Sequence, residues 1–238
     1  MTNLEKRTLI KKLKKGDVIN TVANVKEKNI FDFIKYTIAV KTIVAVQRWI
    51  FGRKSNYKDS HTVIYFNKNK IFSVQLPKAK FITLDDLLKH TKQITIYRYN
   101  ASKFEQKDVS YIEKECEKFV NQDKKYDIGQ LIDILMNTVS GYPYKHTIKW
   151  FDQGRKNKVC SVGTAAMFTN WRHWAEKKGR KIPRLFSKLN PNAWSKRFIK
   201  KFEKNGNKWN VEETFPANFA NAEKMFNKEF KKIFKIKY

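Results

Sequence analysis

The chain has 238 residues, of which 41% are hydrophobic and 14% aromatic. This content is enough to build a buried core, and only eight Gly and five Pro occur, so a disordered, collagen-like or linker-dominated chain is excluded. Lys and Arg number 51 against 22 Asp and Glu, giving a formal net charge of +29. That excess predicts attraction to polyanions, namely nucleic acid, an anionic cell-wall polymer or an anionic membrane surface.

From the sequence we expect no secretory or membrane-spanning segment. The N-terminal residues are basic but lack the apolar stretch and small-residue cleavage site of a secretion signal. The longest apolar stretch, residues 30–51, is interrupted by charged residues, which are costly at the centre of a bilayer. The two cysteines, Cys116 and Cys160, are too few for a disulfide framework, so we expect two free thiols in a reducing compartment.

Hydrophobic periodicity predicts a mixture of helices and strands in the first hundred residues. A helix is expected at 4–15, ended by Gly16, followed by a strand at 17–24 and a helix at 31–51. Two β-branched and aromatic runs flank a polar turn and predict a hairpin. The hairpin strands, and the short helix and strand that follow, are expected at 60–66, 71–76, 84–90 and 93–99.

Helical patterns dominate the rest of the chain. Helices are expected at 110–121, at 127–139, at 160–174 and from 217 or 220 to 234. Because the strands lie together and no βαβ alternation occurs, the predicted class is α+β, with an antiparallel sheet packed against helices. We expect a single domain over 1–238, with its core at about 15–175 and a basic, Lys-rich C-terminal extension at 176–238.

The residues that could carry chemistry are a cysteine and a histidine. The four histidines lack metal-ligand spacing, and nucleotide-binding and serine-hydrolase motifs are absent, so no metal and no cofactor are expected. Cys160 opens a predicted helix, where the helix dipole and free N–H groups lower a thiol pKa and hold an oxyanion. The alternative is that Cys160 is a small buried residue, as free cysteines often are. Cys116 lies on an apolar helix stripe and is expected in the core.

His61 begins a predicted hydrophobic strand. There an imidazole can accept a thiol proton and later protonate a leaving group. The alternative is an ordinary surface or structural histidine. The other histidines, at 90, 146 and 173, have no equally suggestive setting.

Five short sequence pieces occur in a fixed order. They are Gly-Asp at 16–17, Ser-His at 60–61 opening an apolar strand, Tyr-Asp at 126–127, Cys-Ser at 160–161 and the segment 214–220. Together they resemble the motifs of the YiiX-type permuted papain-like cysteine hydrolases, which belong to the circularly permuted NlpC-type amidase superfamily. The resemblance covers about 15–226 and implies a papain-like fold, with Cys160 as nucleophile and His61 as general base.

The third catalytic position departs from the pattern of that family. Its members usually carry a glutamate on the strand after the histidine hairpin, and counting along this chain places Ser73 there, with Gln75 two residues further. A neutral side chain can hold the imidazole through one hydrogen bond, but it stabilises the imidazolium less than a carboxylate does. Reduced or lost activity is therefore an open alternative.

The resemblance implies a cysteine amidase or peptidase that forms an acyl-enzyme intermediate. Peptidoglycan peptide is the substrate that suits the superfamily. The missing secretion signal and the bias to Lys, Asn and Ile favour a cytoplasmic or virion-associated enzyme, encoded by a phage or virus. Two other functions stay open: a lipid acyl hydrolase or acyltransferase of the same fold, and a non-catalytic basic protein that binds nucleic acid or another polyanion.

Overall fold

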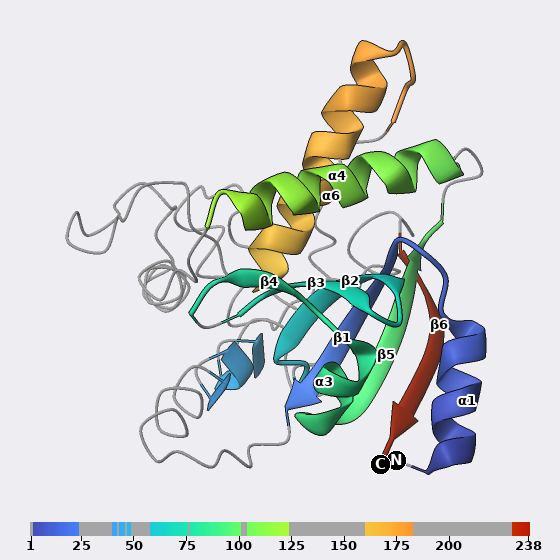
Figure 1. The fold of residues 1–238 in the computed structure, drawn as a ribbon, viewed down its shortest axis with the longest axis vertical. Helices are drawn as coiled ribbons and strands as arrows, with labels where there is room; N and C mark the ends of the chain where they lie inside the picture. Colours follow the sequence, from blue (N-terminus) through green and yellow to red (C-terminus); the bar gives the residue numbers. More distant parts are fainter. Residues whose placement is uncertain are drawn as a thin grey trace, which may run out of the picture.

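A six-stranded antiparallel sheet lies at the centre of the described part of the protein (Figure 1). The structure is a computed structural model, and it describes residues 2–23, 40–41, 43–45, 47–48, 58–75, 77–100, 104–123, 160–182 and 230–238. The strand order is β4-β3-β2-β1-β5-β6. The strands are β1 (Asp17–Ala23), β2 (His61–Asn67), β3 (Lys70–Val74), β4 (Ala79–Ile82), β5 (Thr91–Tyr99) and β6 (Phe230–Lys237). The helices are α1 (Asn3–Lys12), α3 (Leu84–Lys89), α4 (Gln106–Asn121) and α6 (Cys160–Lys177). The prediction of an α+β class with an antiparallel sheet is confirmed.

One face of the sheet packs on α1 and α3. Because side chains alternate along a strand, Ile19, Val63 and Ile96 point to the same face across β1, β2 and β5. Leu9 of α1 and Leu87 of α3 pack into the same buried apolar cluster. This cluster anchors the two helices to the sheet.

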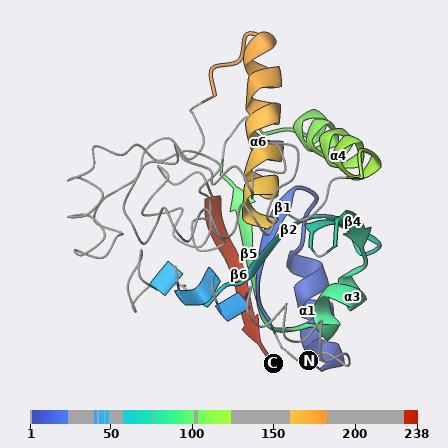
Figure 2. The same ribbon diagram turned by 90° about the vertical axis from the view of Figure 1, so that its left-hand side faces the viewer.

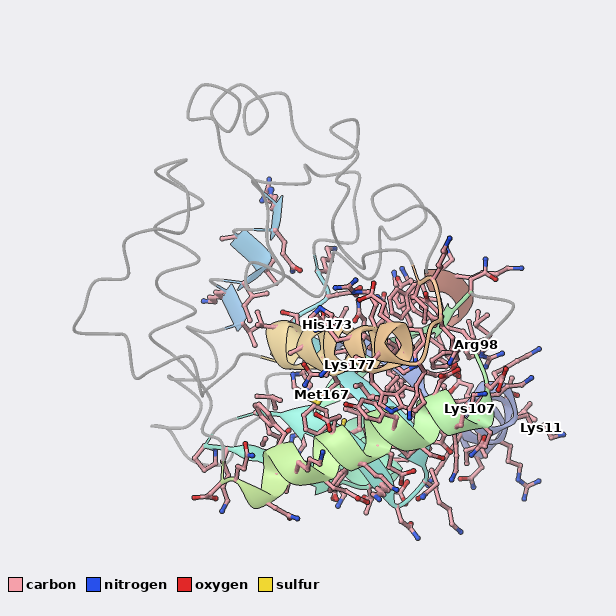
Figure 3. All side chains as sticks on the ribbon, turned by 90° about the horizontal axis from the view of Figure 1, so that it is seen from above. Lys11, Arg98, Lys107, Met167, His173 and Lys177 are labelled. Atoms are coloured by element: carbon pink, nitrogen blue, oxygen red, sulfur yellow. The ribbon has the colours of Figure 1, made fainter. Side chains whose placement is uncertain are left out.

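The other face packs on α4 and α6. The rings of Tyr99 and Phe230, on the paired strands β5 and β6, contact Phe168 of α6 at centroid distances of 6.2 and 5.2 Å. Trp171 of α6 donates a 2.9 Å hydrogen bond from Nε1 to the buried carboxylate of Asp108 in α4. Figure 3 shows α4 and α6 over the sheet, and Figure 2 shows α6 along its length with α4 beside it, seen nearly end-on.

The Gly-Asp pair at the start of β1 has a structural role. Gly16 adopts a φ of +85° and donates its N–H to Tyr65 O at 2.8 Å, which fixes the entry of β1 beside β2. The carboxylate of Asp17 accepts bonds from Arg98 Nε at 2.7 Å and Arg98 Nη2 at 2.8 Å, and from the Lys14 N–H at 2.7 Å. Burial raises the pKa of Asp17, and these donors oppose that effect.

Most predicted elements of the first hundred residues are confirmed, with shifted ends. The first helix ends at Lys12, because Leu13 is already extended. β4 is a strand that the sequence analysis does not predict, and α4 begins four residues earlier than expected. Within 31–51, the described residues 40–41, 43–45 and 47–48 are helical. The helix predicted at 127–139 lies outside the described residues.

The helix predicted to run to residue 234 is wrong over 230–234, because these residues begin β6. The apolar residues Phe230 and Phe234 fit a helical spacing, but Phe234, Ile236 and Tyr238 also alternate with lysines at a period of two. Pairing with β5 satisfies the backbone N–H and C=O groups of both strands. The segment expected as a C-terminal extension thus supplies a strand of the central sheet.

Candidate functional site

Three of the four residues predicted for the site form one hydrogen-bonded chain. The hairpin sets Val63 opposite Ser73 and so brings His61, two residues earlier on the same face, beside the end of β3. His61 Nε2 lies 2.9 Å from Ser73 Oγ, and Ser73 Oγ donates to Gln75 Oε1 at 3.1 Å. The structure therefore brings together the histidine and both candidates for the third position.

The imidazole of His61 is neutral in this environment. Burial lowers the pKa of His61 to about 4. Because the Ser73 hydroxyl donates its hydrogen bond to Gln75 Oε1, the Ser73 oxygen accepts from the Nε2–H of the ring. The lone pair of the neutral ring is then on Nδ1.

A cavity of about 220 Å³ lies beside His61 on the α3 side of the sheet. Gln75 and Thr21 line it from the neighbouring strands, and Lys80, Asp86 and His90 line it from β4 and around α3. The cavity gives the imidazole a polar surrounding of mixed charge.

Cys160 is the first residue of α6 and packs against β2. The main-chain N–H groups of Thr62, Ser161 and Cys160 itself are hydrogen-bond donors that favour the thiolate. Cys160 is nevertheless only 2% exposed, and burial raises the pKa of its thiol to about 11. The predicted lowering of this pKa is wrong, since the loss of hydration outweighs the helix terminus and the N–H donors. Cys116 is fully buried in α4, as expected.

The thiol and the imidazole lie on different sides of β2. His61 shares the face of Ser73 and of the α3 cavity, whereas the next residue, Thr62, faces the side that α6 covers. Within the described part of the chain, the hydrogen bonds of His61 and Cys160 do not join the two side chains. The structure therefore brings Cys160 to the main chain beside His61 but not to its ring.

A buried polar network lies on the Cys160 side of the sheet, and our sequence reasoning missed it. Thr62 Oγ1 donates to Asn20 Oδ1 at 2.9 Å, and Asn20 Nδ2 donates to Asp59 Oδ2 at 3.1 Å. Gln93 Nε2 lies 3.5 Å from Asp59 Oδ1. Burial raises the pKa of Asp59 to about 7, and the Asn20 hydrogen bond and the charge of Lys235 oppose this rise. Polar residues inside apolar strand runs, such as Asn20, were the available signal.

A second missed residue is Thr164, one helical turn after Cys160. It is 1% exposed, and its Oγ1 has no hydrogen-bond partner among the residues that the structure describes. Residues four apart share a helix face, so Thr164 and Cys160 lie on the same side of α6. The signal in the sequence was this spacing.

Among the described residues, no group of three His, Cys, Asp or Glu side chains is arranged to hold a metal. His90 lines the cavity, His173 is exposed on α6, and His146 lies outside the described residues. None of the helices in the described ranges is long and apolar enough to cross a membrane. Comparison of the chain with protein-family models, with curated proteins and with solved structures found no match.

Proposed function

We propose that this protein is a papain-like cysteine hydrolase that cleaves an amide bond, with Cys160 as the nucleophile. The observation that carries the proposal is the position of the buried thiol at the first residue of α6, beside β2, where the main-chain N–H groups of Thr62, Ser161 and Cys160 favour its charged form. Donors of this kind stabilise a thiolate and can hold the oxyanion of a tetrahedral intermediate. The ordered motifs around Gly16, His61 and Cys160 support the same assignment.

The reaction proposed for this site is acyl transfer to sulfur followed by hydrolysis. The thiolate attacks the carbonyl carbon, an S–C bond forms, and the C–N bond breaks as the amine leaves with a proton. Water then attacks the thioester and returns the thiol. His61 is the proposed base, taking the thiol proton and giving it to the amine.

In the resting structure, the protonation states of Cys160 and His61 do not favour the proposed proton transfer, so the mechanism requires a rearrangement of the site. With a thiol pKa of about 11 and an imidazole pKa of about 4, both groups are neutral at pH 7 and proton transfer between them is unfavourable. The ring must also leave Ser73 and approach the sulfur from the other side of β2. Since His61 is the first residue of β2, the proposal places this rearrangement at the start of that strand.

The test is release of product from peptidoglycan peptides by the wild-type protein and by matched cysteine variants. Cys160→Ala should abolish cleavage, whereas Cys116→Ala, which removes the core thiol, should retain it at any pH where the variant is folded. His61→Ala should lower kcat by about 10²-fold or more. Equal cleavage by wild type and Cys160→Ala would exclude the proposed nucleophile.

A second function, binding of a polyanion, is favoured by one specific observation. Strand β6 carries four exposed lysines, Lys231, Lys232, Lys235 and Lys237. We propose that they contribute to binding of nucleic acid, whose affinity then falls steeply with salt. Replacing all four with Gln should reduce the dependence of log K on log salt, while Cys160→Ala leaves it unchanged. An unaltered salt dependence in the lysine variant would count against this second function.

A further inference from the structure

We infer that the Cys160 site accepts a polar, amide-bearing acyl group rather than a hydrocarbon chain, and that Thr164 is a specificity-determining residue. The inference rests on the proposed function, because it assumes that acyl groups reach the Cys160 sulfur. It goes further by choosing between the peptide and lipid substrates that the sequence left open.

The buried face of α6 changes character along its length. Its later turns carry Phe168 and Trp171, whose rings pack against Tyr99 of β5. Its first turns instead carry Cys160 and Thr164, both almost fully buried. The first turns of α6 therefore place two buried hydroxyl groups, those of Ser161 and Thr164, among apolar residues beside the thiol.

The hydroxyl of Thr164 is the feature that points to a ligand. A helical threonine commonly donates to the carbonyl four residues earlier, as Thr169 does to Ala165 O at 2.9 Å. Within the described ranges, the buried Oγ1 of Thr164 has no such partner. Leaving a buried hydroxyl unpaired costs stability, and such groups call for an explanation. A hydrogen bond to a bound acyl group would supply the missing partner.

The sheet opposite these turns is polar as well. Thr62 hydrogen-bonds to Asn20, and Asn20 hydrogen-bonds to the buried carboxyl of Asp59. An amide presents both a donor and an acceptor and can pair with such groups. A hydrocarbon chain can do neither and would leave the Thr164 hydroxyl unpaired. The unpaired Thr164 hydroxyl, beside a polar rather than an apolar part of the sheet, thus favours an amide-bearing group.

Two activated esters of equal chain length test this choice. The p-nitrophenyl ester of N-acetylglycine carries an amide, and the p-nitrophenyl ester of pentanoic acid has methylenes in its place. In each reaction the Cys160 sulfur bonds to the carbonyl carbon and the ester C–O bond breaks. The p-nitrophenolate leaves with the bonding electron pair, and its absorbance reports the rate of acylation.

The variant Thr164→Val removes the hydroxyl and conserves the shape, and Thr169→Val is the matched control on the same helix. We expect Thr164→Val to acylate about five- to tenfold more slowly with the N-acetylglycine ester, as loss of one hydrogen bond implies. Acylation by the pentanoyl ester should change less than twofold. Thr169→Val should leave the ratio of the two rates unchanged.

The same variant has an expected effect on stability that an ordinary structural threonine would not show. Because a methyl group replaces an unpaired buried hydroxyl, Thr164→Val should raise the melting temperature, by roughly 2–4 °C. Thr169→Val, which removes a hydroxyl that is already bonded, should not raise it. A gain in stability together with a selective loss on the amide ester supports the inference.

Other outcomes separate the inference from the proposed function. If Cys160→Ala releases p-nitrophenolate as fast as the wild type with both esters, the proposed function fails, and the inference fails with it. If release depends on Cys160 but Thr164→Val keeps the wild-type ratio of the two rates, or the pentanoyl ester reacts faster in the wild type, only the inference is overturned.

Discussion

His61 Nε2 and Ser73 Oγ lie 2.9 Å apart across the β2–β3 hairpin, and this contact fixes the state of the histidine. The Ser73 hydroxyl donates its hydrogen bond to Gln75 Oε1, so the ring donates from Nε2 to Ser73 Oγ. A neutral chain of this kind orients the imidazole without stabilising its charged form. The low pKa of about 4 for His61 follows from burial.

Replacing Gln75 with Glu should raise the pKa of His61. A carboxylate at position 75 would place a negative charge at the end of the Ser73 hydrogen bond and favour the imidazolium. We expect the pKa to move from about 4 toward about 6. Titration of the ring by ¹⁵N NMR measures this directly. In the double variant Ser73→Ala/Gln75→Glu the rise should be smaller, and an equal rise would show that Ser73 does not transmit the effect.

The buried carboxyl of Asp59 should make stability depend on pH. Its pKa is about 7 in the folded protein against about 3.9 in an unfolded chain, so the folded state holds the proton longer. The stabilisation of the folded state by the protonated Asp59 carboxyl is fully present below about pH 3.9 and is lost as the pH rises through about 7. Compared with Asp59→Asn, the wild type should lose at most about 4 kcal/mol of unfolding free energy over this range.

Urea unfolding at several pH values measures that difference. The titration of His61 is common to both proteins and cancels in the comparison. Asp85→Asn, at an exposed carboxylate paired with Lys6, is the control and should show a nearly flat difference from the wild type. If the difference in unfolding free energy between Asp59→Asn and the wild type also stayed constant with pH, the raised pKa of Asp59 would be contradicted.

Gly16→Ala should destabilise the protein more than Gly179→Ala. Both glycines have a positive φ, +85° and +76°, which disfavours alanine in each case. At Gly16 an added Cβ would also lie 3.2 Å from Val109 Cγ2, whereas at Gly179 nothing lies within 4 Å. We expect losses of about 2–3 kcal/mol at Gly16 and about 1 kcal/mol at Gly179, measured by chemical unfolding. Equal losses would assign the effect to backbone conformation alone.

Arg98→Met should be strongly destabilising, because it leaves the buried carboxylate of Asp17 without its guanidinium. The side chain of Asp17 is 1% exposed, and removing one partner of such a pair costs about 3–5 kcal/mol. The exposed Lys6–Asp85 pair provides the control, since Lys6→Met should cost less than about 1 kcal/mol. The double variant Arg98→Met/Asp17→Asn should recover part of the loss, and no recovery would mean that packing of Arg98 dominates.

The strands could be predicted from the sequence because their pattern is local. The β-branched and aromatic runs at 60–66 and 71–76, with a polar turn between them, were enough for the β2–β3 hairpin, and the resemblance to the hydrolase family placed Ser73 and Gln75 as partners of His61. β6 could not be assigned in this way, because Phe230 and Phe234 satisfy both helical and strand periods. The choice depends on β5, a distant segment with an edge to pair.

The site was predictable in its candidate residues but not in its environment. Chain position suggested an activated thiol at Cys160, yet the pKa depends on how deeply α6 is buried against β2, which no local pattern specifies. The Asp59 network joins residues 20, 59, 62 and 93 from three separate segments of the chain. Such a cluster is visible only once the register of β1, β2 and β5 is known.

The pairing of β6 with β5 has a consequence for synthesis of the protein on the ribosome. Tyr99 leaves the ribosome about 130 residues before Phe230, so β5 is synthesised long before its partner strand β6. Such non-local pairing is slow to form. Nascent chains halted in this interval expose an open strand edge that can capture other chains. Co-translational chaperones should therefore engage this protein longest between these two points.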